Sequence, residues 1–314
     1  MGKGSGYGKV ILFGEQFVVH GVPGIVSAIH LTTDAEVRKI ETPGVNIIDE
    51  RKGAKGYTEK KRAQQKESID RMLKVMGLDE KVSLEIWLGG NLPGFSGIGA
   101  SAASSVAIAR AMSEEFGLNL SDKRINEIAF EAEKAYAGTP SGIDNTAATF
   151  GGLIWFKKNM SGPDTIERLK IKEPIEIIIA DSGVVADTKE MVLGVAERKK
   201  KYPEKYDRIF KQEEELVVKA RKALEDFDLR RVGKLMNDNH RLLQEIEVSC
   251  KELDYLVDLA KKNGAYGAKL TGGGGGGCIV ALTPGKKLQG KVAKAIEREG
   301  FKVLRTKVGV QKSI

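Results

Sequence analysis

The sequence predicts a mixed α/β protein in which strands and helices alternate along 314 residues. Short β-branched runs broken by Gly and Pro fill the first third, apolar residues recur at helical spacing in the middle, and a strand–helix–strand pattern ends the chain. A chain of this length forms one large domain or two ordinary ones, and we expect two closely packed domains. Either size buries enough apolar surface to need no disulfide or metal.

The first half begins with strands and continues with two helices. Strands are expected at residues 9–13, 24–29 and 82–88. Helices are expected at 101–116 and Asp122–Ala137, because apolar residues recur there every three or four positions. Ser121 is well placed to cap the second helix.

The second half is expected to be mostly helical. Residues 151–156 and Ile175–Asp181 have strand character, and 188–263 read as helices with breaks near Pro203, Asp226 and Ser249. The chain then ends with the strand Cys278–Leu282, a helix at 286–299 and a strand at 303–310. A domain boundary near residue 185 fits this change in character.

The cysteines and the apolar runs indicate where the protein acts. Only Cys250 and Cys278 are present, far apart and outside any metal-binding spacing, which predicts a reducing compartment and no zinc site. No apolar run reaches the length of a signal peptide or of a membrane span. We therefore expect a cytoplasmic protein that does not enter a membrane.

The net charge of +8 suits nucleic acid, an anionic membrane or a small anionic substrate. Basic residues concentrate at 51–66 and 197–205, where Glu or Gln dilutes them and aromatic residues are few, so both stretches are predicted to be solvated surface. No nucleic-acid-binding motif occurs in the sequence. A small anionic substrate is the preferred explanation.

A glycine-rich loop, PGFSGIGASAA at residues 93–103, runs directly into the helix expected at 101–116. Glycines let the backbone approach a phosphate, and the free N–H groups and dipole of a helix start attract anions. The loop is neither a Walker A motif nor a dinucleotide fingerprint. The alternative is a tight turn followed by a helix that packs through small residues.

The segment GTPSGIDN at residues 138–145 is expected to be a loop, and it carries Asp144. A loop aspartate is usually a turn-former. Glu133, however, falls at the edge of the apolar stripe of the preceding helix. Together with the hydroxyl of Ser101, these carboxylates resemble what a Mg²⁺-bound triphosphate needs.

Two further segments are candidates for a site. KLTGGGGGGC at 269–278 contains glycines that cannot pack a core, so it indicates close approach to a ligand or to the phosphate loop, with a flexible tether as the alternative. In YGKVILFGEQFVVHG at 7–21, Lys9 opens a strand, and Glu15, Gln16 and His20 follow its glycine turn. A lysine at a strand edge is ordinarily a surface residue.

In this order and spacing, the four segments resemble the GHMP small-molecule kinases, and within them the mevalonate kinase family, from about Gly8 to the end of the chain. DSG at 181–183 with TKE at 188–190 resembles another shared stretch. The resemblance implies a two-domain α/β fold. Residues 1–185 would form the GHMP kinase N-terminal ATP-binding domain, like ribosomal protein S5 domain 2, and 186–314 a ferredoxin-like C-terminal domain.

The resemblance also implies an activity, the ATP-dependent phosphorylation of the 5-hydroxyl of (R)-mevalonate in isoprenoid synthesis, with Mg²⁺ as cofactor. Asp144 would be the base, Lys9 would pair with it, and Ser101 and Glu133 would hold Mg²⁺. The implied phosphate-binding residues are Pro93, Gly97, Ile98, Gly99, Ala100, Ser101 and Ala102. The implied substrate-binding residues are Lys9, Glu15, Gln16, His20, Ser141, Asp144 and Thr188. The implied third motif contains Thr271, Gly272, Gly273, Gly274 and Gly275.

The sequence departs from the family pattern at three positions. Ala100 stands where Ser is common, which removes one hydroxyl from the phosphate loop, and Tyr7 stands where Pro is usual. Gln16 stands where the family usually has His. Its amide can still form hydrogen bonds, but it cannot take up or release a proton as a histidine can.

Other functions remain open. They are another GHMP kinase, acting on phosphomevalonate, homoserine or a sugar, a diphosphomevalonate decarboxylase, and a non-catalytic nucleotide sensor. The presence of Lys9, Ser101, Glu133 and Asp144 together favours an enzyme. The expected partners are mevalonate and ATP, without nucleic acid or membrane, and a homodimer is left open.

Overall fold

The computed structural model describes all residues except 52–58, 80, 94–96, 139 and 311–314. It divides into two compact units that interleave along the chain. Unit 1 contains residues 1–9, 30–95 and 99–151, and unit 2 contains 10–29, 96–98 and 152–314. The predicted domain ranges 1–185 and 186–314 remain a prediction, because the two units are defined by contacts within the structure and not by membership of a domain family.

Unit 1 contains a sheet to which the long strands β1 (Gly2–Phe13) and β2 (Gly24–Lys39) contribute their outer parts. Strand β4 (Leu84–Gly90) pairs antiparallel with β2, with Thr33 opposite Gly90, and β3 (Val45–Asp49) runs parallel to β4. Leu84, Ile86 and Leu88 alternate with more exposed neighbours and are buried. This period of two is what a sheet covered on one face requires.

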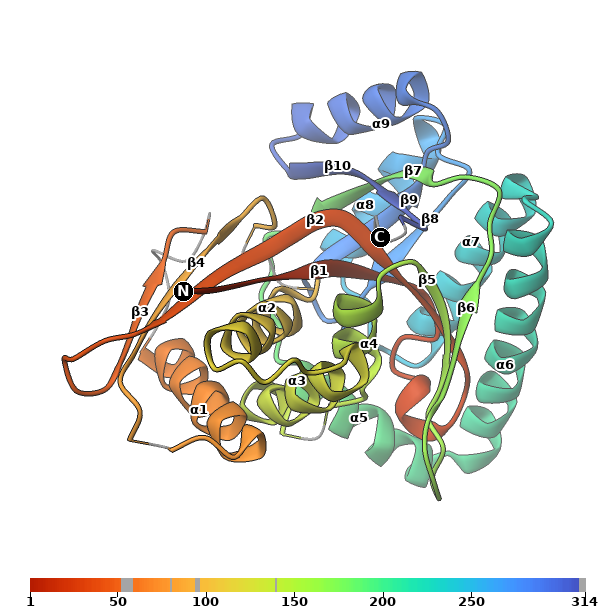
Figure 1. Cartoon of the computed structure of the whole chain (residues 1–314). Coiled ribbons are helices and arrows are strands. Elements are labelled where there is room, and N and C mark those ends of the chain that lie inside the picture. Colours follow the sequence, from red (N-terminus) through yellow and green to blue (C-terminus); the bar gives the residue numbers. More distant parts are fainter. Residues whose placement is uncertain (52–58, 80, 94–96, 139, 311–314) are drawn as a thin grey trace. The chain divides into compact units, whose positions relative to one another are not determined.

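Helices α1 (Glu59–Met76), α2 (Ala100–Glu115), α3 (Asp122–Ala137) and α4 (Ile143–Phe150) complete unit 1, and Figure 1 shows the first three side by side. The predicted apolar stripes of α2 and α3 are buried in its core. Strand β1 approaches α2 very closely, since a Cβ on Gly6 would lie 2.2 Å from the carbonyl oxygen of Ala103. Glycine in the first strand therefore allows backbone to pack on backbone.

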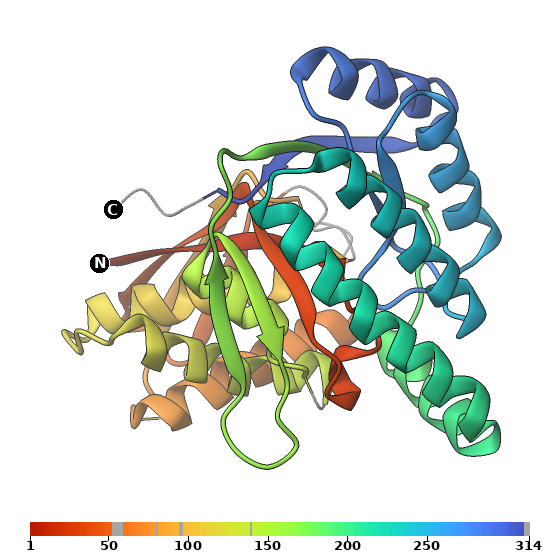
Figure 2. The same ribbon diagram turned by 90° about the vertical axis from the view of Figure 1, so that its right-hand side faces the viewer.

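Unit 2 is built on an antiparallel sheet. Strand β7 (Ile175–Asp181) lies between β10 (Lys302–Val308) and β9 (Cys278–Leu282), and β8 (Gly267–Thr271) pairs with β9. Strand β5 (Leu153–Lys157) pairs with the first part of β2 and forms a hairpin with β6 (Thr165–Leu169), as Figure 2 shows.

Among the described residues of unit 2, five α-helices and a short 3₁₀ helix accompany this sheet. They are η1 (Val18–His20), α5 (Thr188–Lys201), α6 (Pro203–Glu225), α7 (Leu229–Glu245), α8 (Lys251–Lys262) and α9 (Lys286–Arg298). Helix α6 buries one stripe of residues, from Tyr206 to Leu224, and packs against α7. Within the described part of the chain, none of the helices is both long and apolar enough to cross a lipid bilayer.

Several predicted elements are confirmed with their bounds, namely α3, β7 and β9. The cap is confirmed as well, because the Arg124 N–H donates to Ser121 Oγ at 3.3 Å. The breaks predicted near Pro203, Asp226 and Ser249 are the junctions between α5, α6, α7 and α8.

Other predictions were wrong. The prediction of solvated surface for 51–66 was wrong for Arg51, which is 4% exposed and paired with Asp49 at 2.6 Å, and for the buried Gln65. Glu59, Lys61, Arg62 and Lys66 are exposed, as predicted. Asp144 was predicted to lie in a loop and instead lies in the first turn of α4. The elements β3, α1, α4, β6 and β8 were not predicted at all.

Candidate active site

Lys9 and Asp144 form an ion pair in unit 1, with 3.0 Å between Nζ and Oδ1. Lys9 is on β1 and only 2% exposed, whereas the Asp144 side chain is 34% exposed. The pairing of Lys9 with Asp144 that the resemblance implies is therefore present in the structure, and the catalytic role of each residue remains a prediction. A buried ammonium beside a half-exposed carboxylate fixes the position of the carboxylate and leaves it accessible to a ligand.

The start of α4 places Asp144. Gly142 precedes the helix with φ of 90°, and the Ile143 N–H donates to Ser141 Oγ at 3.3 Å. Ser141, predicted to contact substrate, therefore supports the helix start, and a role toward substrate remains a prediction. A carboxylate in the first turn is favoured by the helix dipole.

Glu133 on α3 is 5% exposed and accepts hydrogen bonds from two serines of α2. Ser101 Oγ donates at 3.1 Å and Ser105 Oγ at 3.4 Å. Burial, and next the charge of Asp144, raise the pKa of Glu133 to about 8, against the opposing effects of Ser101, Lys9 and Ser105. A bound cation would favour the ionised form of this carboxyl.

The phosphate loop enters α2 through Gly99, which has φ of 71°. The Ala103 N–H donates to the Gly99 carbonyl at 2.9 Å, so the N–H groups of Ala100, Ser101 and Ala102 precede the first helical hydrogen bond. A Cβ on Gly99 would lie 2.6 Å from Lys9 Cγ. Glycine at this position therefore lets the lysine stem lie against the helix start.

The remaining phosphate-loop residues lie in different places. Pro93 is buried in unit 1, Gly97 and Ile98 belong to unit 2, and residues 94–96 lie outside the described part of the chain. Gly97 lies beside the third motif, because a Cβ on Gly272 would be 3.2 Å from Gly97 Cα. The predicted approach of the glycine run to the phosphate loop is confirmed.

The glycine run also lies against two other segments of unit 2, the start of α5 and the chain after α7. Added Cβ atoms on Gly273, Gly274 and Gly275 would lie 2.6 Å from Thr188 Oγ1, 2.2 Å from the Val248 carbonyl oxygen and 2.7 Å from Met191 Sδ, respectively. The Gly275 N–H donates to the same Val248 carbonyl at 2.8 Å. These contacts show an ordered, closely packed segment, and the alternative of a flexible tether was wrong.

Gln16 and Thr188 meet at Gly273. Gln16 Nε2 donates to the Gly273 carbonyl, and Gln16 has a left-handed backbone with φ of 56°. Its Oε1 is buried and has no hydrogen-bond partner among the described residues. A strained residue with an available acceptor is typical of a functional position.

His20 lies apart from this meeting point, with its ring 5.2 Å from that of Phe210. Burial, and then the charge of Lys199, lower the pKa of His20. Thr271 is buried and its hydroxyl binds backbone, accepting from the Ile11 N–H at 3.1 Å and donating to the Ile11 carbonyl at 3.0 Å. The structure therefore gives Thr271 a structural contact, and its assignment to a ligand site remains a prediction.

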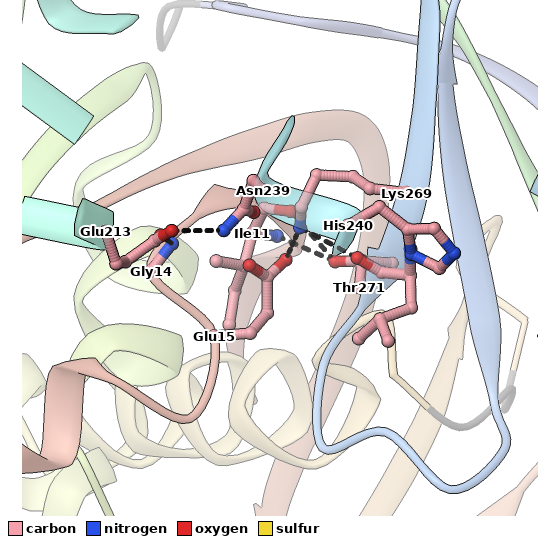
Figure 3. A network of polar contacts seen from close by, with 9 residues as sticks. Ile11, Gly14, Glu15, Glu213, Asn239, His240, Lys269 and Thr271 are labelled. Atoms are coloured by element: carbon pink, nitrogen blue, oxygen red, sulfur yellow. Dashed lines mark hydrogen bonds and ion pairs between the residues drawn. The ribbon is translucent and has the colours of Figure 1, made fainter. Parts of the chain in front are cut away.

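Glu15 belongs to a buried polar network of unit 2 that sequence reasoning missed (Figure 3). It pairs with Lys269 of β8, and neither side chain is exposed. Glu213 of α6 and Asn239 of α7 are buried in the same network. The sequence did contain a sign of this network, because Glu213 lies between Phe210 and Leu216 on the apolar stripe of α6, where a charged residue is unusual.

Comparisons with known proteins identify the family. Residues 65–152 match the family model of the GHMP kinases N terminal domain, and residues 220–302 match that of the GHMP kinases C terminal. The mevalonate kinase of Pyrococcus horikoshii is 36% identical, and the alignment covers 93% of this chain and 91% of that protein. The mevalonate kinase of Thermococcus sibiricus is 34% identical, with 96% and 94% covered.

Solved structures give the same result. The crystal structure of L. major mevalonate kinase in complex with R-mevalonate superposes with a TM-score of 0.92 at 38% identity, covering 100% of this chain and 97% of that one. The Methanococcus jannaschii mevalonate kinase superposes with a TM-score of 0.80 at 25% identity, covering 98% of each chain. The chain belongs to the GHMP kinases and, within them, to the mevalonate kinase family.

Proposed function

We propose that this kinase transfers the γ-phosphoryl group of ATP to the 5-hydroxyl of (R)-mevalonate. The observation that carries the proposal is the Lys9–Asp144 ion pair, with 3.0 Å between Nζ and Oδ1. The Lys9 stem lies against Gly99 at the start of α2, the predicted phosphate-binding segment. The choice of acceptor is supported by the similarity to mevalonate kinases, one of them solved with R-mevalonate.

The reaction needs a base and a positive charge near the attacking oxygen. The hydroxyl oxygen forms a bond to the γ-phosphorus, the bond from that phosphorus to the bridging oxygen of ADP breaks, and the hydroxyl proton goes to Asp144. Lys9 is held 3.0 Å from the carboxylate and stabilises the oxygen as negative charge develops. Phosphoryl transfer depends mainly on such positioning and charge neutralisation.

Magnesium fits the donors of unit 1. Glu133 has a buried carboxyl group whose pKa is raised to about 8, so a bound cation would stabilise its ionised form. The Ser101 hydroxyl lies 3.1 Å from this carboxyl group. When bound, Mg²⁺ neutralises phosphate charge, and it takes few protein ligands because phosphate and water complete its coordination. Accordingly, the described residues contain no cluster of three or more His, Cys, Asp or Glu side chains that could hold a metal alone.

The N–H groups of Ala100, Ser101 and Ala102, which precede the first helical hydrogen bond of α2, would bind the phosphates. In unit 2, Gln16 and Thr188 would contact the acceptor, since Gln16 Oε1 can accept a hydrogen bond from a hydroxyl. His20, the cytoplasmic location, the two domain ranges and the homodimer remain predictions.

A substrate panel tests the proposal. ADP release is measured with Mg·ATP and, in turn, mevalonate, phosphomevalonate, homoserine or galactose, and ³¹P NMR identifies the product. We expect turnover with mevalonate and a phosphomonoester product, without release of carbon dioxide. Turnover with another alcohol alone would refute mevalonate and preserve the kinase class, whereas ATP binding without any turnover would indicate a sensor.

A further inference from the structure

Glu213 is a fully buried carboxyl group that connects three segments of unit 2. Its Oε1 accepts a hydrogen bond from the Gly14 N–H at 3.1 Å, and its Oε2 lies 2.6 Å from Nδ2 of Asn239. Figure 3 shows Glu213 between Gly14 and Asn239, with the Glu15–Lys269 pair beside them. Helix α6 is thereby joined to α7 and to the turn that follows β1.

The surroundings of Glu213 favour its neutral form. The charged groups that face it are Glu15, from the turn after β1, and Lys269, from β8, and these two already pair with each other. Burial, and next the charge of Glu15, raise the pKa of Glu213 to about 8, although Lys269, Asn239 and Gly14 oppose the shift. A second ionised glutamate would place its negative charge near that of Glu15 in a buried environment, which is unfavourable.

The two hydrogen bonds of Glu213 as they stand suit an ionised carboxylate, but the bond to Asn239 can adapt to a protonated carboxyl group. Asn239 Oδ1 is buried without a hydrogen-bond partner among the described residues. Oxygen and nitrogen of a side-chain amide are assigned from the surrounding network, so the Asn239 amide can be turned by 180°. A protonated Glu213 can then donate to Oδ1, whereas an ionised carboxylate only accepts.

The turn that Glu213 holds carries the residue proposed to meet the acceptor. Gly14 has φ of 94° and Gln16 has φ of 56°. A left-handed conformation is unfavourable for Gln16 and persists only when surrounding contacts impose it. The Gly14 bond to Glu213 fixes one side of the turn, and the bond from Gln16 Nε2 to Gly273 fixes the other.

We propose that Glu213 is a positioning residue for the phosphoryl acceptor, because its protonated carboxyl group holds Gly14 and so presents the Gln16 amide to the substrate. The inference rests on the proposed function, since it takes mevalonate as the acceptor that Gln16 meets. Glu213 acts through Gly14 and Gln16 and does not itself contact the reacting atoms.

Steady-state kinetics of three variants test this role at pH 7. Glu213→Ala removes both hydrogen bonds, and we expect the KM for mevalonate to rise about ten-fold, equivalent to one well-formed hydrogen bond, while the KM for ATP changes little. Glu213→Gln imitates the protonated carboxyl group, so its KM for mevalonate should lie close to that of the wild type. Glu214→Gln, on the exposed side of α6, is the matched control.

Two outcomes at this pH would overturn the proposal. One is a Glu213→Gln variant that is folded by circular dichroism and as impaired as Glu213→Ala. The other is a Glu213→Ala variant with an unchanged KM for mevalonate. A pH series distinguishes this role from a purely structural one. The KM of the wild type for mevalonate should rise above pH 8, whereas the KM of Glu213→Gln should stay level.

A substrate-free measurement separates this inference from the proposed function. The ¹⁵N chemical shift of the Gly14 amide, followed by NMR from pH 6 to 9.5 in the full chain, should titrate in the wild type and stay flat in Glu213→Gln. A Gly14 signal that titrates equally in both would overturn the inference even if mevalonate is the substrate. A titration confined to the wild type would support it even if the acceptor proves to be another alcohol.

Discussion

The Lys9–Asp144 pair allows a sharp prediction at the level of single residues. Asp144→Asn keeps the shape of the side chain and removes its basicity, so we expect kcat to fall by roughly 10²–10⁴-fold, the usual contribution of a general base. The affinity for ATP, measured by calorimetry, should stay within about two-fold because the start of α2 is unchanged. The exposed Asp258→Asn is the control. Full activity of Asp144→Asn would remove this residue from the mechanism.

Gln16 allows a second prediction, which concerns the acceptor. Gln16→Leu keeps the approximate volume and loses both the bond to the Gly273 carbonyl and the free Oε1. We expect the KM for mevalonate to rise about ten-fold, with the KM for ATP unchanged. Equal increases in both constants would show that Gln16 supports the fold and does not select the acceptor.

At the level of elements, the start of α2 depends on Gly99 for two reasons. Its φ of 71° is unfavourable for other residues, and its missing Cβ makes room for Lys9. Gly99→Ala should therefore lower stability by about 1 kcal/mol and also lower kcat, because Lys9 must move. Chemical denaturation and steady-state kinetics measure the two effects.

Gly117, just after α2, provides the matched control for that prediction. It has φ of 65° and nothing within 4 Å of an added Cβ. Gly117→Ala should therefore show a similar loss of stability and an unchanged kcat. If both variants retained full activity, the steric contact with Lys9 would have no catalytic importance.

The sequence predicted elements with strong periodicity and missed those without it. Helix α3 was predicted with its bounds because its apolar stripe is continuous and Ser121 marks its start. Helix α1 begins with a charged stretch, and its buried apolar residues Ile69, Met72 and Leu73 come in its second half. Helix α4 is short and buries small residues, so it looked like a loop, and Asp144 was assigned to the wrong kind of element.

The arrangement of the whole molecule was the least predictable from local patterns. Residues 10–29 belong to the same unit as 152–314, and this grouping depends on pairings such as Ile25 with Trp155 that no local spacing records. The motifs indicated Lys9, Ser101, Glu133 and Asp144 as candidate site residues, whereas Glu213 belongs to no motif. Its importance follows from burial and from its contact with Gly14, which only the structure provides.

Buried carboxyl groups also make the stability of the molecule depend on pH. Burial raises the pKa of Glu213 in the folded state to about 8, above its ordinary value of 4.5, so the folded state holds the proton more strongly than the unfolded state does. This contribution to stability is fully present below about pH 4.5 and is lost as the pH rises through about 8. At about 1.4 kcal/mol per pH unit, the loss amounts to a few kcal/mol between pH 5 and 9.

Glu213→Gln removes this titration, and its thermal midpoint should therefore fall less steeply than that of the wild type between pH 6 and 9. The measurement is a thermal unfolding series without nucleotide, with Glu214→Gln as the exposed control that should follow the wild type. Parallel curves for Glu213→Gln and the wild type would show that Glu213 is ionised in the folded protein.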